Sequence, residues 1–431
     1  MKYQLLQKEM SLFNLNDKQK IAYNLMVNGS NIFLTGSGGV GKSHLIKTFR
    51  QSYNNKRIIA MTSLTGVSAI LINGTTLHSY FGIGLGTGSL DFLITKIQKS
   101  SYFKKRWIKL DTLIIDEISM LDPELFDKLE NIARIIRKNE KPFGGIQLIL
   151  SGDWAQLPVV KKTMFCFEAD TWSTCIKHTI YLTEIVRQND KNFQKCLNNI
   201  RLGNVTPEVK KILLSRVGVD LTNEFGIKPT QFFPTNAMVD YINEQELDIL
   251  SEKGLEFYQY DMTLELHKFV PNKQYILDKF IKDCPAIEIL QLCVGSQVML
   301  IYNLNVEQGL VNGSRGVITS FVDDKPIVKF VDGHEVMIDY NVWEIEMDGN
   351  KFLTITQIPL RLGYAFSIHK AQGLTLDYAI VDITNCFEYG QAYCALSRVK
   401  NLEGLSILGL DFDKIRCNPK VLEFYKQFDT Q

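Results

Sequence analysis

The stretch that most constrains the fold is a glycine-rich loop that fits the phosphate-binding pattern G-x-x-x-x-G-K-[ST]. It reads Gly36, Ser37, Gly38, Gly39, Val40, Gly41, Lys42 and Ser43. The apolar segment 31–35 before it predicts a buried strand, and residues 44–50 after it predict a helix. In that context the loop N–H groups and the helix N-terminus form a nest for phosphate oxygens. We therefore expect ATP and Mg²⁺ as cofactors, with Lys42 at the β- and γ-phosphates and the Ser43 hydroxyl on the metal ion.

Length and composition exclude several other classes of protein. A chain of 431 residues, 45% of them hydrophobic, is too long for a single core and predicts two or three domains. The net charge is +1, so a polyanion would be bound by a local groove and not by the field of the whole molecule. The eight cysteines form no C-x-x-C pair, which indicates reduced thiols and no zinc or iron–sulfur site. No signal peptide or membrane span is expected, so we predict an intracellular protein of the cytoplasm or nucleus.

A second strong signal lies at residues 112–117, where an apolar strand ends in two carboxylates. Asp116 is expected to hold Mg²⁺ together with the Ser43 hydroxyl, and Glu117 to orient and deprotonate the attacking water. Another apolar strand, residues 147–151, leads to Gln156 at the same sheet edge. The amide of Gln156 is predicted to sense the γ-phosphate.

Several positions allow two interpretations each. Gln19 can offer its amide to the adenine edge, or it can be an ordinary surface glutamine. Thr65 lies in a turn that suits a backbone phosphate, although a simple strand–helix connection is favoured. His78, Ser79 and Phe81 can hold a phosphate and stack a base, or Phe81 can be part of the core. The basic and aromatic run 102–107 is interpreted as a solvated helix end with a packed tryptophan, in preference to a nucleic-acid contact.

The order of these motifs resembles that of superfamily 1B helicases. The phosphate loop is followed by Leu-Ile-Ile-Asp-Glu-Ile-Ser-Met-Leu at 113–121 and by Gly-Asp-x-x-Gln-Leu-Pro at 152–158. The linking segments, 122–128 and 141–147, are similar to the signature of the petite-integration-frequency (PIF-type) DNA helicases, with RecD-like and Dda-like motors as more distant relatives. The resemblance extends from Gln19 to Arg398, and it departs from the family pattern at Leu64 and Val159.

The resemblance also implies roles in the second half of the chain. Arg187 and Arg398 are expected to reach the γ-phosphate, and Gln372 and Gly373 to face the nucleotide. The remaining expected contacts are with the DNA strand, and they are Thr235, Asn236, His369 and Lys370. Asn312 and Arg315 are expected either to grip DNA or to cap a tight turn.

The implied fold is α/β, with two RecA-like parallel-sheet motor domains in tandem at residues 1–183 and 184–431. A small wedge-like insertion is expected around 82–107 in the first domain. Short strands separated by glycines predict a β-rich, barrel-like insertion around 297–360 in the second. The expected function is an ATP-dependent DNA helicase that acts in replication, repair, recombination or telomere maintenance. The expected partners are single-stranded DNA and single-strand/duplex junctions, with a monomer bound on DNA and no membrane. The 5′-to-3′ direction comes from the family alone.

Two other functions remain open on the residues alone. A phosphate-loop ATPase that remodels protein would hydrolyse ATP at a rate that single-stranded DNA leaves unchanged. A binding module with an inactive nucleotide site would be insensitive to Lys42→Ala and Glu117→Gln, and the intact motif set argues against it. An RNA strand in place of DNA also remains open.

Overall fold

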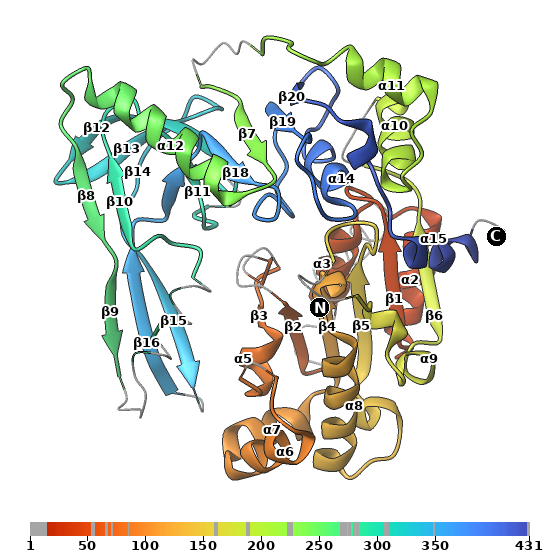
Figure 1. The fold of residues 1–431 in the computed structure, drawn as a ribbon. Helices are drawn as coiled ribbons and strands as arrows, with labels where there is room; N and C mark the ends of the chain where they lie inside the picture. Colours follow the sequence, from red (N-terminus) through yellow and green to blue (C-terminus); the bar gives the residue numbers. More distant parts are fainter. Residues whose placement is uncertain are drawn as a thin grey trace, which may run out of the picture. The chain divides into compact units, whose positions relative to one another are not determined.

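The computed structural model describes residues 15–52, 57–64, 68–69, 72–84, 86–158, 163–186, 190–221, 227–267, 274, 277–278, 281, 284–305, 308, 310–347 and 350–428. The chain forms two compact units (Figure 1). Unit 1 consists of Met1–Arg187, Met347–Gly349 and Pro419–Gln431, and unit 2 of Gln188–Glu346 and Asn350–Asn418. Residues 184–187 and the last helix, α15 (Pro419–Lys426), which were expected in the second domain at 184–431, belong to unit 1.

A six-stranded parallel sheet forms the centre of unit 1, in the order β3-β2-β4-β5-β1-β6. Its strands are β1 (Ile32–Gly36), β2 (Ile59–Ser63), β3 (Thr75–Thr76), β4 (Thr112–Asp116), β5 (Gln147–Gly152) and β6 (His178–Leu182). The residues of β1, β4 and β5 are buried throughout, as expected of strands in a parallel sheet covered on both faces.

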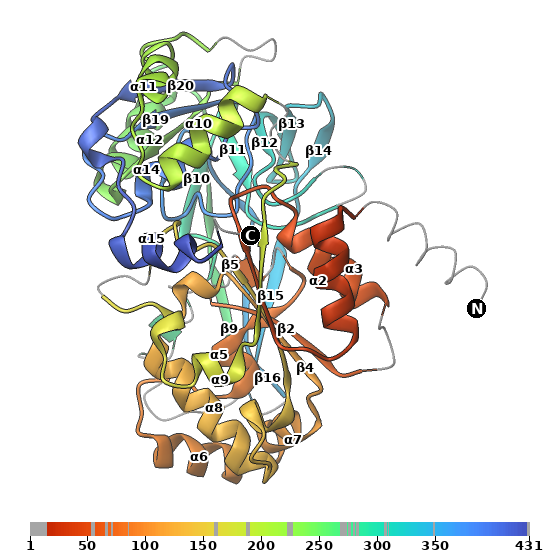
Figure 2. The same ribbon diagram turned by 90° about the vertical axis from the view of Figure 1, so that its right-hand side faces the viewer.

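Helices cover both faces of this sheet (Figures 1 and 2). Ile32 and Leu34 of β1 pack against α2 (Asp17–Val27) and α3 (Lys42–Ser52). Phe33 points to the opposite face, because side chains alternate along a strand, and its ring contacts Trp154 and Trp172. Further helices of unit 1 are α5 (Leu77–Phe81), α6 (Leu90–Lys99), α7 (Ser101–Lys109), η1 (Ile118–Met120), α8 (Pro123–Arg137), η2 (Pro142–Gly145), η3 (Cys166–Glu168) and α9 (Trp172–Cys175).

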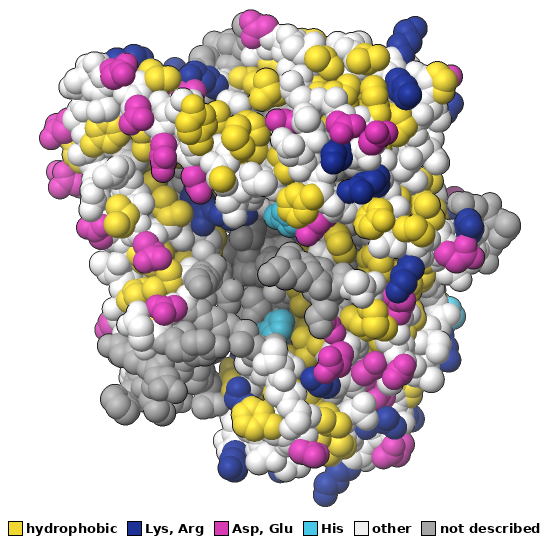
Figure 3. All heavy atoms as spheres, viewed as in Figure 1, with side chains coloured by type: hydrophobic (Ala, Val, Ile, Leu, Met, Phe, Trp, Pro, Cys, Tyr) yellow, Lys and Arg dark blue, Asp and Glu magenta, His cyan; other side chains and the backbone are white. Residues whose placement is uncertain are grey.

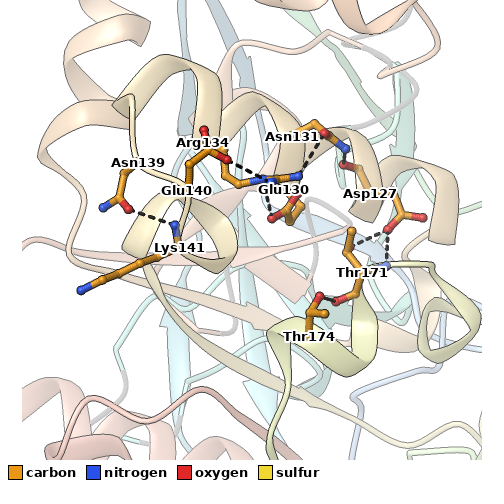
Figure 4. A network of polar contacts seen from close by, with 9 residues as sticks. All are labelled: Asp127, Glu130, Asn131, Arg134, Asn139, Glu140, Lys141, Thr171 and Thr174. Carbon is orange, nitrogen blue, oxygen red and sulfur yellow. Dashed lines mark hydrogen bonds and ion pairs between the residues drawn. The ribbon is translucent and has the colours of Figure 1, made fainter.

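A polar network ties α8 to the segments that follow it (Figure 4). The Asp127 carboxylate accepts hydrogen bonds from the backbone N–H of Thr171 at 2.9 Å and from its hydroxyl at 2.5 Å. Arg134 forms ion pairs with Glu130, which is buried, and with Glu140. A buried carboxylate is costly unless it is paired, and Arg134 supplies the partner of Glu130. The network therefore stabilises the position of α8 in unit 1.

Unit 2 contains the second parallel sheet, in the order β18-β7-β19-β20. Its strands are β7 (Thr230–Phe233), β18 (Ala365–Ser367), β19 (Ala379–Asp382) and β20 (Leu405–Gly409). The helices of this unit include α10 (Lys191–Arg201), α11 (Pro207–Leu214), α12 (Asn236–Ser251), α14 (Gln391–Leu396) and η4 (Phe412–Lys414). The expected α/β class, with two parallel sheets in one chain, is confirmed.

Unit 2 also contains antiparallel strands. They are β8 (Tyr258–Asp261), β9 (Thr263–Leu266), β10 (Ile289–Leu292), β11 (Gln297–Leu300), β12 (Arg315–Val322), β13 (Lys325–Phe330), β14 (Glu335–Met337), β15 (Asn341–Met347), β16 (Asn350–Gln357) and β17 (Leu360–Leu362). They pair in the orders β14-β13-β12-β11-β17, β15-β16-β9 and β10-β8, and Val298, Leu300 and Phe330 contribute to a shared core. Among the described residues, no helix combines the length and the apolar character that crossing a bilayer requires.

Candidate nucleotide site and nucleic-acid surface

The phosphate loop joins β1 to α3, and its glycines are required by the backbone. Gly36 has φ +143°, and a Cβ placed there would lie 2.3 Å from the Leu182 carbonyl oxygen. Gly41 has φ +84°, and a Cβ there would lie 2.6 Å from Nε2 of Gln19. Lys42 Nζ donates hydrogen bonds to the carbonyl oxygens of Gly36 at 2.8 Å and Ser37 at 3.1 Å. The ammonium group therefore lies over the loop that is expected to hold the phosphates.

Gln19 is buried and is not a surface glutamine. Its Nε2 donates to the Val40 carbonyl oxygen at 3.1 Å, and its Oε1 accepts from the Asn16 N–H at 3.1 Å. The second bond belongs to a capping box that starts α2. Gln19 thus braces the phosphate loop from α2, and its contact with adenine remains a prediction.

Asp116 ends β4 next to the phosphate loop. Burial raises the pKa of its carboxyl group, while the N–H of Glu117, the Lys42 ammonium and the Ser43 hydroxyl act in the opposite direction. Lys42, Ser43 and Asp116 are therefore brought together within unit 1, as the sequence predicts. A buried carboxylate beside a hydroxyl fits Mg²⁺, which prefers oxygen ligands and is usually bound by one or two carboxylates together with phosphate oxygens and water. Within the described residues, no group of three or more His, Cys, Asp or Glu side chains could hold a metal ion instead.

Glu117 has a left-handed backbone, with φ +53° and ψ +45°, at the start of η1. This conformation is uncommon for a residue with a side chain and is concentrated at functional sites. Gly152 at the end of β5 allows the close packing of η1, since a Cβ there would lie 2.8 Å from Cγ2 of Ile118. Glu117, the residue proposed to activate water, is therefore attached to a backbone segment that close packing against β5 holds in place.

The turn after β5, which carries Gln156, is held by the C-terminal helix. Asp153 is fully buried, and its Oδ1 accepts hydrogen bonds from the N–H of Ala155 and the hydroxyl of Tyr425, both at 3.1 Å. The same hydroxyl accepts from the Trp154 N–H at 3.2 Å. Tyr425 gave no signal in the sequence, because its partners lie far away along the chain.

Arg398 follows α14 in unit 2 and is 2% exposed. Its guanidinium donates to the carbonyl oxygens of Cys394 at 2.7 Å and Leu374 at 3.4 Å, and to the Ser397 hydroxyl at 2.7 Å. The bond to Leu374 places Arg398 next to Gln372 and Gly373, so three of the predicted nucleotide contacts of unit 2 lie together. Arg187 and Thr65 lie outside the described residues.

Four of the predicted DNA contacts of unit 2 lie at one edge of its parallel sheet. β7 and β18 are parallel neighbours, so the residues after each strand emerge at the same edge. Thr235 and Asn236, after β7, are exposed at the start of α12; after β18, His369 is half-buried and Lys370 is exposed. The Ile368 N–H donates to the Phe233 carbonyl oxygen at 2.9 Å and links the two segments.

Two residues that sequence reasoning missed support this edge. Glu388 Oε2 lies 2.9 Å from Nε2 of His369. Gln391 is fully buried; its Oε1 accepts from the N–H groups of Phe387 at 2.9 Å and Glu388 at 3.3 Å, and its Nε2 donates to the Pro234 carbonyl oxygen at 3.3 Å. The available signal was the Gly-Gln pair ahead of the motif that carries Arg398.

Two of the predicted DNA contacts are corrected. Phe81 is 0% exposed and its ring centroid lies 3.9 Å from that of Trp107, so it belongs to the core and cannot stack a base. Arg315 is 4% exposed, at the start of β12, and burial lowers its pKa while Asp377 opposes that effect. The turn before it contains Gly313 at φ +95°, which supports the tight-turn interpretation.

Three other residues that are predicted to contact DNA are at least partly accessible to solvent. On α5, His78 is half-buried and Ser79 is exposed. Asn312 is half-buried, and its backbone N–H donates to Oδ1 of Asn303 at 2.8 Å. These three side chains remain candidates for the DNA contact.

The phosphate loop, the carboxylates after β4 and the second parallel sheet define a phosphate-loop nucleoside-triphosphatase architecture. The model of the PIF1-like helicase family matches residues 14–211, and that of the DNA helicase Pif1 2B domain matches residues 278–321. The chain belongs to the PIF1-like helicase family.

Relatives and solved structures agree with this assignment. Protein 030L of Invertebrate iridescent virus 6 is 40% identical over 96% of this chain and 94% of its own length. The ATP-dependent DNA helicase PIF1 of Xenopus laevis is 41% identical over 97% of this chain. The matched region covers 65% of that protein's own length. The crystal structure of Pif1 helicase from Candida albicans matches with a TM-score of 0.83 and 37% identity, covering 96% of this chain and 99% of that one. Pif1 from Bacteroides in complex with ADP-AlF4 matches with a TM-score of 0.79 and 29% identity, covering 96% and 97%.

Proposed function

We propose that this protein is an ATP-dependent DNA helicase that moves along single-stranded DNA and opens duplex DNA ahead of it. One observation carries the proposal: a single chain brings Lys42, Ser43 and Asp116 together at the phosphate loop of unit 1 and has solvent-accessible polar side chains at one sheet edge of unit 2. Family membership supports it, because the solved relatives include Bacteroides Pif1 described as bound to ssDNA and in complex with ADP-AlF4.

The residues of unit 1 would bind and position ATP. Lys42 and the loop N–H groups hold the β- and γ-phosphates, and Glu117 orients the attacking water and accepts its proton. Gln156 senses the γ-phosphate. Ser43 and Asp116 would hold Mg²⁺, which when bound neutralises charge on the phosphate oxygens.

Arg187, at the end of the first segment of unit 1, and Arg398 of unit 2 would supply positive charge to the transferred phosphoryl group. Arg398 is now bonded to three groups of its own unit, so contact with ATP requires that it exchange some of these bonds for phosphate oxygens. Binding and hydrolysis of ATP would then favour different arrangements of the two units, which is what stepwise movement needs.

The edge of unit 2 would hold the DNA backbone. The exposed start of α12 offers N–H groups to a phosphate, and Lys370 adds a positive charge. Lys, Arg, Asp and Glu side chains are otherwise interspersed over the drawn face (Figure 3), in line with the net charge of +1. Binding would therefore depend on this local set of contacts and not on a general basic surface.

Several parts of the proposal come from the family. These are 5′-to-3′ movement, a monomer on DNA, the wedge role of residues 82–107 and the contact of Asn312. The contacts of Thr65, His78 and Ser79 are proposed from the residue types alone. One solved relative is described as unwinding forked dsDNA with two coordinating helicases, so two copies at a fork are an alternative to the monomer. Each of the eight cysteines, all in the described part of the chain, carries a free thiol, which fits a reducing compartment.

The test is unwinding of a duplex with one single-stranded tail, made in both polarities. Each base-pair step costs about 1.4 kcal/mol of stacking, so unwinding must depend on ATP and Mg²⁺. We expect unwinding of the 5′-tailed duplex by the wild type and no unwinding by Lys42→Ala. Unwinding of the 3′-tailed duplex alone would show that movement is 3′-to-5′ and contradict the proposed direction. ATP hydrolysis without unwinding and without stimulation by DNA would favour the protein-remodelling alternative.

A further inference from the structure

Pairing between β4 and β5 brings a serine next to the proposed magnesium ligand. The two strands are parallel neighbours, and Ile115 pairs with Leu150. The next residues along the strands are Asp116 and Ser151, so in-register pairing places these two side chains beside each other on one face of the sheet. On its other side Ser151 pairs with Leu34, which belongs to the core under α2 and α3. The serine therefore faces the helix that carries Lys42 and Ser43.

Ser151 has a buried hydroxyl group, and the residue is 0% exposed. Other buried hydroxyls of this sheet bond to the neighbouring strand. Oγ1 of Thr62 donates to the Ile114 carbonyl oxygen at 2.7 Å, and Oγ of Ser63 donates to that of Asp116 at 3.1 Å. Within the part of the chain that the structure describes, Oγ of Ser151 has no hydrogen-bond partner of good geometry. A buried polar group without a partner is costly, so this hydroxyl requires an explanation.

The Ser151 hydroxyl is nonetheless close to the carboxyl group of Asp116. Burial raises the pKa of that carboxyl group, and the Ser151 hydroxyl opposes the rise more strongly than the N–H of Glu117 does. The hydroxyl therefore lies within reach of the carboxylate, and reorientation of the two side chains can complete a hydrogen bond. A carboxylate that binds a metal ion through one oxygen keeps its second oxygen available as an acceptor for such a bond.

We propose that Ser151 is a positioning residue of the magnesium site, whose hydroxyl donates a hydrogen bond to Asp116 when ATP and Mg²⁺ are bound. This inference rests on the proposed function, which assigns Asp116 as a metal ligand. Hydrogen bonds from outside the ligand set fix the orientation of metal-binding side chains. A buried hydroxyl that gains its partner together with the metal ion stabilises the metal-bound state selectively.

The test is equilibrium binding of a fluorescent ATP analogue to the full chain, at increasing Mg²⁺ concentration and in excess EDTA. For Ser151→Ala, the Mg²⁺ concentration that gives half of the gain in affinity should rise by about 10-fold to 100-fold, the range for loss of a hydrogen bond to a metal ligand. The affinity in EDTA should equal that of the wild type, because the phosphate loop is intact. The free energy of unfolding without Mg²⁺ should not fall, since the hydroxyl that is removed has no bond to lose.

Ser63→Ala is the matched control. Ser63 pairs with Asp116 from the other neighbouring strand, and its hydroxyl bonds to the backbone carbonyl oxygen of Asp116 and not to the carboxylate. We expect this variant to be less stable than the wild type and to keep the wild-type Mg²⁺ requirement.

Three outcomes would contradict the inference. An equal rise in the Mg²⁺ requirement of both variants would assign the effect to a general disturbance at the end of β4, and an unchanged requirement in Ser151→Ala would leave the serine without a role at the metal ion. A wild type that binds the analogue equally well in Mg²⁺ and in EDTA would contradict the magnesium site of the proposed function as well. The first two outcomes leave the proposed function intact, so the two failures are distinguishable.

Discussion

The hydroxyl oxygen of Tyr425 lies 2.7 Å from Oγ1 of Thr35, although 390 positions separate them in the chain. Thr35 directly precedes the phosphate loop, and the same hydroxyl contacts Asp153 and the N–H of Trp154 beside the turn of Gln156. One phenol group from the C-terminal helix thus joins the ends of β1 and β5, from which two parts of the nucleotide site emerge.

Tyr425→Phe should destabilise unit 1 and slow ATP hydrolysis. The substitution leaves the buried polar groups of Thr35, Asp153 and Trp154 without the shared hydroxyl, which costs about 1–3 kcal/mol of the free energy of unfolding. Denaturant unfolding and ATPase assays measure the two effects. Tyr241→Phe is the control, since that hydroxyl accepts an exposed bond from Gln245 and its loss should change neither quantity. Equal stability of Tyr425→Phe and wild type would refute the bridging role.

Glu117→Gln should retain ATP binding and lose turnover. The amide has nearly the shape of the carboxylate but cannot accept the proton of the attacking water, so kcat should fall by about 10²–10⁴-fold. Binding of a fluorescent ATP analogue and steady-state hydrolysis separate the two effects. A kcat close to that of the wild type would remove Glu117 from the role of general base.

Arg398→Ala should retain ATP binding and reduce turnover by about 10³–10⁵-fold, the range found for arginines that neutralise a transferred phosphoryl group. The substitution also removes hydrogen bonds within unit 2, so a structural control is needed. Arg216→Ala provides one, because Arg216 bonds to the carbonyl oxygens of Leu405 and Glu403 in the same unit. We expect Arg216→Ala to lower stability and keep turnover. Loss of stability without loss of turnover in Arg398→Ala would limit Arg398 to a structural role.

The thiols should be poorly reactive in the native protein. Burial raises the pKa of Cys175 to about 11 and those of Cys196 and Cys386 to about 12. A raised pKa lowers the fraction of thiolate, the reactive form, at pH 8. Cys284 is half-buried while the other seven are buried, so iodoacetamide should modify Cys284 first. Mass spectrometry of the native and unfolded protein tests this order, and rapid native labelling of Cys175 would contradict it.

The sequence predicts those parts of the site that depend on local patterns. The phosphate loop and the carboxylates of β4 each lie within a few residues of the strand that positions them, and parallel pairing brings the strand ends together. The spacing of Gln19 allows either a nucleotide contact or a surface position, and its burial depends on contact with Val40, which sequence alone does not show.

Other features depend on packing between distant segments. Phe81 is an aromatic residue between polar ones, and only its contact with Trp107 shows that it belongs to the core. From the sequence alone Arg315 can be a surface cation, and only the structure shows that it is buried at the start of β12. Tyr425 and Gln391 act through bonds to remote backbone and side-chain groups. No local pattern marks Tyr425, and the Gly390-Gln391 pair does not show which groups Gln391 bonds.

The central claim is that ATP hydrolysis by unit 1 is linked to a single strand bound by the chain. The most direct measurement is steady-state ATP hydrolysis with Mg²⁺, in the presence and absence of oligo-dT, for the wild type and Lys42→Ala. The account predicts clear stimulation of the wild type by oligo-dT and negligible hydrolysis by the variant under both conditions. Hydrolysis by the wild type at the same rate with and without oligo-dT would contradict it.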